Sequence, residues 1–522
     1  MLKKLHGRKL AVCLIGGAMY ALFSAFGWQA EHGGVIWAGG ALLVAALLAW
    51  PIAALLAVLL ERGYTRALRR EKTFRAGRAF AFILACYVPM FCVAFPGSFA
   101  YDVPYQLRQV VTGAYSTHHP LLHTLALGGL LQLGRALGDI NLGAALYTAL
   151  QMALLAGCFA LTCGSIARQS GARAAKRAAV FFALYPLNMV MAVNATKDVL
   201  FGGFFALTLA LLNEIQEKPS RGLALKIAAC GALAVMLRNN MAYAALVWLA
   251  LLTIGLRKAE KSAALAMLLA LAVGLCGNAA LKHATRAESG DMSEMLSWPI
   301  QQLARARLYD EERLTDAEKE AIDELMPGEA WACYDPTISD PVKFEFDTQA
   351  FRADVKKYVG VWLSVGKKCA GTYLDATMAL TYPFFYPYRE YRVSGYYVQM
   401  GMSDAYDAGW CDFDPPESRS LFPRTLASLS WRFGAKGAMQ IPVVGWLFNM
   451  GVIVWTMLFF ALREMYWGRW RRFGTALLPV LLWGTFLLGP VMAGRYIYPF
   501  VCALPVLAAR PGRSVKEAAR HG

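Results

Sequence analysis

The chain has 522 residues, of which 57% are hydrophobic, and a formal net charge of +17. Soluble domains are about 45–50% apolar, so the composition excludes an ordinary soluble protein. The positive charge does not indicate a nucleic-acid partner, because most Lys and Arg residues lie in short segments between apolar runs, as in the cytoplasmic loops of membrane proteins.

Long apolar runs follow one another along most of the chain. About twelve reach the 17–25 residues that cross a hydrocarbon core. They are 10–29, 35–60, 79–96, 142–164, 177–193, 199–214, 223–238, 241–256, 263–282, 440–462, 474–490 and 496–510. The first run is not expected to be a cleaved signal peptide, since a second run follows at once. We therefore predict an all-α polytopic membrane protein with about twelve transmembrane helices.

The basic loops also predict the topology. If they all lie inside, both termini are cytoplasmic, provided that 116–138 lies on or dips into the outer face without crossing. A crossing there would place the basic segment 168–177 outside. We expect four parts. Residues 1–78 form two transmembrane helices and a basic loop, and 79–282 form a transmembrane core with its first external loop at 97–141. Residues 283–438 form an extracytoplasmic domain, and 439–522 form C-terminal transmembrane helices and a basic tail.

The predicted external domain carries most of the acidic residues of the chain. Thr315–Leu325 reads as a helix with a capping box, and the amphipathic segment Val355–Tyr382 is expected on the membrane surface. Cys333 and Cys411 are candidates for a disulfide, with Cys369 as a competing partner.

Polar residues gather where the apolar runs reach the predicted outer face. Asp102 follows directly on the run 79–96, and a carboxylate at that depth is costly and therefore a functional candidate. Gln106 comes four residues later, on the same face if both lie in one helix. The other candidates are His118, His119, Lys197, Asp198, Arg238, Glu294, Gln302, Arg495 and Tyr496. His123 lies in an otherwise apolar stretch and is assigned a structural role.

This set of residue types predicts a particular chemistry. A carboxylate such as Asp102 can take a proton from a hydroxyl nucleophile. The isolated cations Lys197, Arg238 and Arg495 can hold a phosphate leaving group, and apolar surroundings suit a lipid tail. We predict sugar transfer from a polyprenyl-phosphate donor to a glycan, lipid or protein acceptor, with inversion at the sugar. Membrane lipids are expected partners, and nucleic acid is not.

At these positions the chain resembles the GT-C superfamily of integral-membrane glycosyltransferases. It is most similar to an uncharacterised bacterial polytopic membrane family with a Pro-Gly…Asp…Gln…His-Pro pattern. The matching residues are Pro96-Gly97, Asp102, Gln106, His119-Pro120, the Thr-Lys197-Asp198 turn, the segment ending at Gln302, and Arg495-Tyr496. The resemblance covers most of 79–510. It implies a GT-C-like fold, a catalytic first external loop and a multi-pass protein of the bacterial inner or plasma membrane with an extracytoplasmic active site.

The chain departs from the superfamily in lacking paired acids in this loop, since Val103 and Pro104 follow Asp102. We therefore expect no cofactor and disfavour a metal-bridged mechanism, while leaving a divalent metal open. Structural explanations also exist: Asp102 as a helix N-cap, Lys197 and Asp198 as an ion pair, and Arg238 as a snorkelling residue.

Two other functions remain as alternatives. A flippase for lipid-linked oligosaccharides would place ionisable residues in the middle of its spans, where this chain has few. An envelope polysaccharide polymerase or ligase is also polytopic with an Arg- and His-rich external loop. The early position of Asp102 favours the transferase over the polymerase or ligase.

Overall fold

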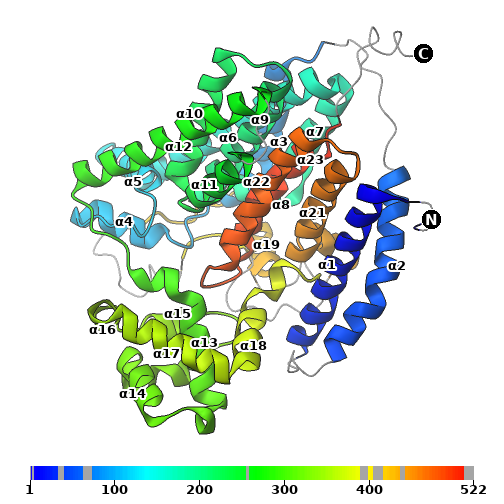
Figure 1. The fold of residues 1–522 in the computed structure, drawn as a ribbon. Helices are drawn as coiled ribbons and strands as arrows, with labels where there is room; N and C mark the ends of the chain where they lie inside the picture. The colour runs from blue at the N-terminus through cyan, green and yellow to red at the C-terminus, as the bar shows by residue number, and fades with distance from the viewer. Residues whose placement is uncertain are drawn as a thin grey trace.

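The computed structural model describes residues 2, 5–32, 40–62, 73–253, 258–387, 398–403, 415–434 and 441–510. In these ranges the chain is helical, with isolated β-bridges and no strand. The helices form an apolar bundle, and a smaller polar domain lies on one side of it (Figure 1). The all-α prediction is therefore confirmed for the described residues.

The bundle contains thirteen of the described helices. They are α1 (Gly7–Glu31), α2 (Gly40–Arg62), α3 (Ala76–Ala94), α6 (Ile140–Ser170), α7 (Ala172–Leu184), α8 (Pro186–Ala192), α9 (Lys197–Glu217), α10 (Arg221–Leu237), α11 (Asn240–Thr253), α12 (Lys258–Thr285), α21 (Met450–Tyr466), α22 (Trp470–Leu487) and α23 (Tyr498–Ala508). Among the described residues, six helices are long and apolar enough to cross a membrane: α1, α2, α3, α6, α9 and α12. By length and composition, these helices are compatible with a membrane protein.

The other predicted spans are helical but shorter or interrupted. The run 177–193 is divided into α7 and α8 where Tyr185 precedes Pro186. Proline has no N–H to donate and disfavours a helical conformation in the residue before it, which favours a break at this position. The total of twelve spans stays a prediction.

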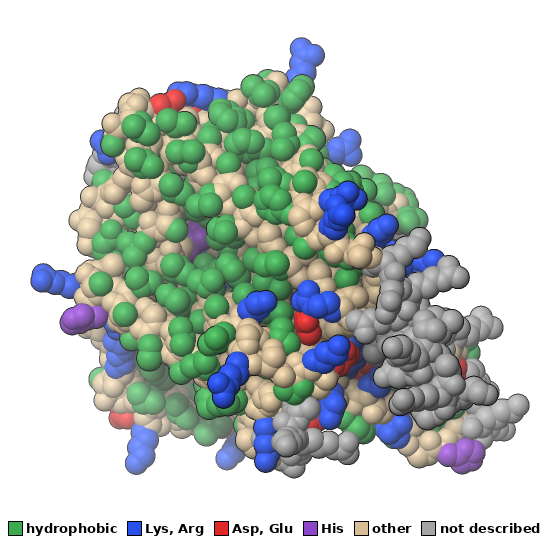
Figure 2. Space-filling model, turned by 90° about the horizontal axis from the view of Figure 1, so that it is seen from above, with side chains coloured by type: hydrophobic (Ala, Val, Ile, Leu, Met, Phe, Trp, Pro, Cys, Tyr) green, Lys and Arg blue, Asp and Glu red, His purple; other side chains and the backbone are tan. Residues whose placement is uncertain are grey.

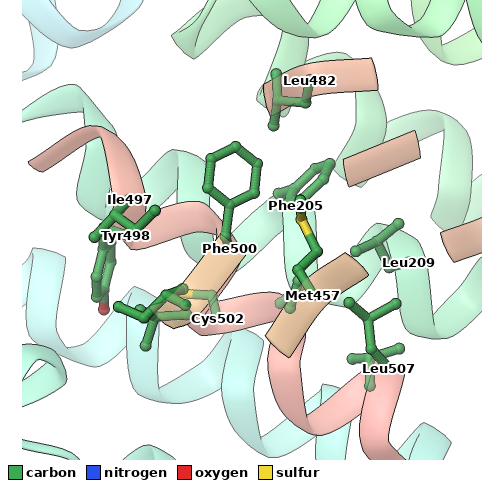
Figure 3. Close-up of a cluster of buried hydrophobic side chains, with 14 of the residues drawn as sticks. Phe205, Leu209, Met457, Leu482, Ile497, Tyr498, Phe500, Cys502 and Leu507 are labelled. Atoms are coloured by element: carbon green, nitrogen blue, oxygen red, sulfur yellow. The ribbon is translucent and has the colours of Figure 1, made fainter. Parts of the chain in front are cut away.

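Helix α9 lies at the centre of the bundle, in contact with α6, α10, α12, α22 and α23. Close approach requires small residues: a Cβ on Gly202 would lie 3.0 Å from Cys502 Sγ. Helix packing in lipid depends on such close contacts, because lipid tails leave little hydrophobic driving force between helices. Phe205 and Leu209 of α9 meet Met457, Leu482 and Phe500 in this core (Figure 3).

The outside of the bundle is apolar as well. Leu47 on α2 and Leu265 on α12 are each 69% exposed. Figure 2 shows a broad hydrophobic face on which basic side chains outnumber acidic ones. An apolar surface of this extent on the long helices is expected where they contact lipid.

The polar domain has a hydrophobic core of its own, which includes Ile300, Ile322 and Val365. Its helices are α13 (Ser297–Tyr309), α14 (Asp316–Leu325), α15 (Asp340–Lys343), α16 (Thr348–Ala353), α17 (Val355–Lys368) and α18 (Ala370–Thr381). The predicted capping box is confirmed, since Thr315 Oγ1 accepts from the Glu318 N–H and the Glu318 carboxylate accepts from the Thr315 N–H.

Two predictions for this domain concern the segment 355–382 and the pairing of its cysteines. The segment Val355–Tyr382 forms two helices, α17 and α18, separated at Cys369. Its position on the membrane surface stays a prediction. Cys369 is buried, Cys333 is exposed, and neither is in a disulfide with the other. Cys411 lies outside the described residues.

The segment 97–141, predicted as the first external loop, holds α4 (Val103–Thr112) and α5 (Leu121–Ala136). Before α4, the Ser98 N–H donates to Val193 O and the Ala195 N–H donates to Ser98 O, both at 2.8 Å. These bonds fix the loop beside the turn between α8 and α9. Helix α5 packs against α4 and α6.

The remaining described elements are short. They are α19 (Pro423–Gly434) and 3-10 helices at Met292–Leu296, Glu311–Arg313, Pro327–Cys333, Tyr382–Phe384, Val444–Leu447 and Gly494–Ile497.

Candidate functional site

Five charged side chains from four separate segments meet in one cluster. They are Asp102 before α4, Lys197 and Asp198 at the start of α9, Arg238 at the end of α10, and Arg495 just before α23. Their side chains are between 0% and 21% exposed. We call these five residues the charge cluster.

Asp102 is held by two of the cations. Lys197 Nζ donates to its Oδ2 at 2.8 Å, and the Arg495 guanidinium donates to both carboxylate oxygens at 3.1 Å. Although Asp102 occupies the N-cap position of α4, its side chain makes no capping hydrogen bond. Burial alone would raise the pKa of Asp102, but Arg495 and Lys197 outweigh it and hold the pKa well below its usual range.

Asp198 and Arg238 form a second ion pair inside the charge cluster. The Asp198 side chain is fully buried and contacts the Arg238 guanidinium. Thr196 Oγ1 donates to Asp198 Oδ2 at 3.3 Å, and Arg495 Nε lies 3.9 Å from the same oxygen. Arg495 thus faces both carboxylates and joins the two pairs.

Aromatic rings border these guanidinium groups. The Arg238 Cζ lies 4.4 Å from the ring centroid of Phe486 and 4.5 Å from that of Tyr496, and Arg495 Cζ lies 4.7 Å from that of Tyr101. Cations over aromatic faces gain stabilisation while remaining partly desolvated.

His119 lies next to the charge cluster. Its Nδ1 is 3.7 Å from Asp102 Oδ2 and accepts from Lys197 Nζ at 3.4 Å. Burial, with the nearby Lys197 adding to it, lowers the pKa of His119 well below its usual range. The imidazole is therefore neutral, which suits an acceptor for the Lys197 ammonium.

Sequence reasoning missed Tyr101. Its φ of 55° is unusual for a residue with a side chain, and its hydroxyl accepts from the Gln399 N–H. Burial raises the pKa of Tyr101, so its hydroxyl stays protonated. An aromatic residue at the end of an apolar run is common in membrane proteins, and no sequence signal distinguished this one.

Several predicted site residues lie elsewhere. Gln106 was expected on the same face as Asp102, but its amide donates to His123 and Thr124 at 3.0 Å, on α5. The i, i+4 relation fails because Asp102 is the N-cap and its side chain turns toward α9. Gln302 donates to Thr377 Oγ1 at 2.9 Å inside the polar domain.

His118 and Glu294 form a pair of their own. Their side chains are 4.0 Å apart, and Glu294 accepts from Lys343 Nζ at 2.8 Å. The pair lies where the segment 97–141 meets the polar domain, since the Thr117 N–H donates to Glu288 O at 2.8 Å. His118 also packs edge-on against His119, with ring centroids 4.5 Å apart, so the pair joins the polar domain to the residue beside the charge cluster.

A chain of buried hydrogen bonds connects α4 to the turn that carries Lys197. Gln106 donates to His123 Nδ1 at 3.0 Å, His123 Nε2 lies 2.8 Å from the Tyr147 hydroxyl, and that hydroxyl donates to Gln151 Oε1 at 3.0 Å. Gln151 in turn donates to Ala192 O and Asn194 O. Burial lowers the pKa of His123 to about 3, so the ring is neutral and donates through Nε2.

Replacing Tyr147 by Phe should therefore destabilise the protein by about 1–3 kcal/mol, because His123 and Gln151 each lose a buried partner. Thermal unfolding in detergent measures the effect. Tyr243→Phe is the matched control, since Tyr243 is 54% exposed on α11, and it should change stability by no more than about 0.5 kcal/mol. Equal effects of the two substitutions would contradict the assignment.

In the part of the chain that the structure describes, no three His, Cys, Asp or Glu side chains are grouped as metal ligands. The model of a protein family described as "Family of unknown function (DUF6020)" matches residues 111–521. This range includes Lys197, Asp198, Arg238 and Arg495, and it begins after Asp102. No curated protein and no solved structure matches the chain.

Proposed function

This chain belongs to the DUF6020 family, whose function is unknown, and we propose that it transfers a sugar from a polyprenyl-phosphate donor to an acceptor hydroxyl. In this proposal the shorter helices of the bundle also cross the membrane. They give about twelve spans in a GT-C-like architecture. The site then faces the extracytoplasmic side of a bacterial inner or plasma membrane, with both termini in the cytoplasm.

The observation that carries the proposal is the convergence of the charge cluster. Charged side chains at the ends of membrane helices are costly to bury, yet Asp198 is fully buried and Arg238 and Arg495 are 9% and 11% exposed. These residues come from segments as far apart as 393 positions in the chain. Three cations against two carboxylates leave an excess of positive charge that suits a phosphate.

The guanidinium groups have donors to offer such a phosphate. Among the described residues, Arg238 Nε and Arg495 Nε are buried without a hydrogen-bond partner. Buried donors that lack a partner are unfavourable, and charge-assisted bonds to a phosphate oxygen would satisfy them. Lys197 adds a third cation at 2.8 Å from Asp102, so the phosphate and the carboxylate would share one set of cations.

At the anomeric carbon, the reaction forms one bond to oxygen and breaks another. The acceptor hydroxyl oxygen attacks the anomeric carbon, and the bond from that carbon to the phosphate oxygen breaks. The hydroxyl proton passes to Asp102, and the polyprenyl phosphate leaves with the bonding electron pair, held by Lys197, Arg238 and Arg495. Attack opposite the leaving group inverts the configuration at the sugar.

The depressed pKa of Asp102 makes it a weak base while both cations bind it. When a phosphate draws Lys197 and Arg495 toward itself, less positive charge acts on the carboxylate and its pKa rises toward the range suited to proton transfer. Asp102 would thus become an effective base only with donor bound.

A panel of radiolabelled polyprenyl-phosphate sugars, given to the purified wild-type protein in lipid nanodiscs, tests the proposal. We expect one donor to release polyprenyl phosphate in the presence of an acceptor. Unlabelled polyprenyl phosphate should compete, and polyprenol, which lacks the phosphate, should not. Absence of turnover with every donor, together with saturable binding of a lipid-linked oligosaccharide, would instead favour the polymerase or flippase alternatives.

A further inference from the structure

A cavity of about 270 Å³ lies at the end of α9 opposite the charge cluster. Helix α9 has 21 residues, so the two sites are separated by roughly 30 Å along its axis. The lining includes Asn213 and Gln216 of α9 and the segment Gly468–Arg472 at the start of α22. The cavity needs a separate explanation because none of its lining residues belongs to the charge cluster.

Arginines dominate the charge of this cavity. Arg469, Arg471 and Arg472 line it, opposed by Glu217 and Glu260. Arg472 Nη2 donates to Glu217 at 3.2 Å, and Arg469 Nε lies 3.2 Å from Glu464. Arg471 is exposed, and among the described residues its one hydrogen bond is a long one of 3.4 Å from Nη1 to Gln216 O. Arg471 therefore has most of its donors available to a ligand.

The start of α22 adds to the positive potential. The helix begins at Trp470 and has 18 residues, and the side chain of its N-cap Arg469 accepts no hydrogen bond from the first N–H groups. The first N–H groups of a helix have no partner within it and favour an anion. Arg471 and these N–H groups border the same cavity.

The opposite wall offers acceptors. Asn213 and Gln216 are 6% and 4% exposed. Among the described residues, Asn213 Oδ1 and Gln216 Oε1 have no hydrogen-bond partner. Buried carbonyl oxygens without a donor are costly, and hydroxyl groups on a bound anion would satisfy them. A ligand that fits both walls carries an anionic group at one end and hydroxyl groups at the other.

We propose that this cavity binds a phosphate group that bears hydroxylated substituents, as in the headgroup of an anionic glycerophospholipid. The volume exceeds the roughly 10–15 Å³ that one water needs by an order of magnitude. Trp470 is 49% exposed at the rim, and tryptophan is favoured at the level of lipid headgroups. Basic pockets between membrane helices are known to hold such headgroups. The site is independent of the proposed transferase function.

Thermal unfolding of the full chain in detergent tests this, with short-chain phosphatidylglycerol, short-chain phosphatidylcholine and free glycerol phosphate as the three probes. Phosphatidylglycerol should raise the Tm saturably, whereas phosphatidylcholine should not. Arg471→Gln should weaken this binding about tenfold, as expected for the loss of one charge-assisted contact. Saturable binding of glycerol phosphate with the same dependence on Arg471 would identify a soluble ligand of the same chemistry.

Arg173→Gln is the matched control. Arg173 is an exposed arginine of α7, outside the cavity, and its replacement removes the same charge. It should leave phosphatidylglycerol binding unchanged, and both variants should match the wild-type Tm without lipid. An equal loss of binding in the two variants, unchanged binding in Arg471→Gln, or equal stabilisation by phosphatidylcholine would overturn the proposal.

Discussion

Replacing Asp102 by Asn is expected to lower the rate of sugar transfer by roughly 10²–10⁴-fold, the range contributed by a general base. The Michaelis constant for the donor should stay the same or fall, because Lys197 and Arg495 lose the carboxylate that now occupies them at 2.8 and 3.1 Å. A purely structural Asp102 would instead raise this constant or lower the yield of folded protein. Initial rates at several donor concentrations, measured with the donor that the panel experiment selects, separate these outcomes.

Asp139→Asn provides the matched control for this experiment. Asp139 is also an N-cap, here of α6, where its carboxylate accepts from the Asn141 N–H at 2.9 Å and from Arg419 at 2.7 Å. Asparagine caps helices about as well as aspartate, so this variant should keep its activity and stability. If Asp102→Asn turned over donor as fast as Asp139→Asn, Asp102 would have no part in the chemistry.

Replacing Asp198 by Asn is expected to destabilise the protein by about 3–5 kcal/mol, because Arg238 is left as a buried charge without its partner. Asp198 is fully buried and Arg238 is 9% exposed. Glu214→Gln is the matched control on the same helix. Glu214 pairs with Arg168, whose side chain is 56% exposed, so its loss should cost only about 0.2–1 kcal/mol.

A double-mutant cycle with Arg238→Met shows whether the two residues act as a pair. The double variant should be more stable than the sum of the two single losses predicts, since removing both charges leaves neither one buried alone. Unfolding of all four proteins in the same detergent gives the coupling free energy. Additive losses would mean that Asp198 depends on Arg495 or Thr196 more than on Arg238.

The sequence by itself determined which parts of the chain are apolar helices. Hydrophobicity and length are properties of neighbouring residues, so runs such as 199–214 and 263–282 could be identified without the fold, and they correspond to α9 and α12. The same holds for the Thr315 capping box, which needs only residues three apart. Local rules also placed Asp102, Lys197 and Arg495 at the ends of apolar runs.

Local rules failed where a residue's partner comes from another helix. Gln106 has a helical spacing from Asp102 but hydrogen-bonds to α5, and Glu294 contacts His118 and Lys343 away from the charge cluster. Tyr101 could not be selected because its φ of 55° and its position against Arg495 exist only in the folded chain. The break at Pro186 shows that even an apolar run of sufficient length need not be one helix.

Only the tertiary structure decided which charges pair. Asp102 meets Lys197 across 95 residues and Arg495 across 393. The sequence alone places each of these residues at the end of a helix and shows the sign of its charge. Many different ion pairs would be consistent with those two properties. Packing selects one of them, because glycines such as Gly202 let α9 approach α23 closely enough to bring the start of α9 beside Arg495. The helices and their charged ends could therefore be predicted from the sequence, whereas the charge cluster depends on how the helices pack.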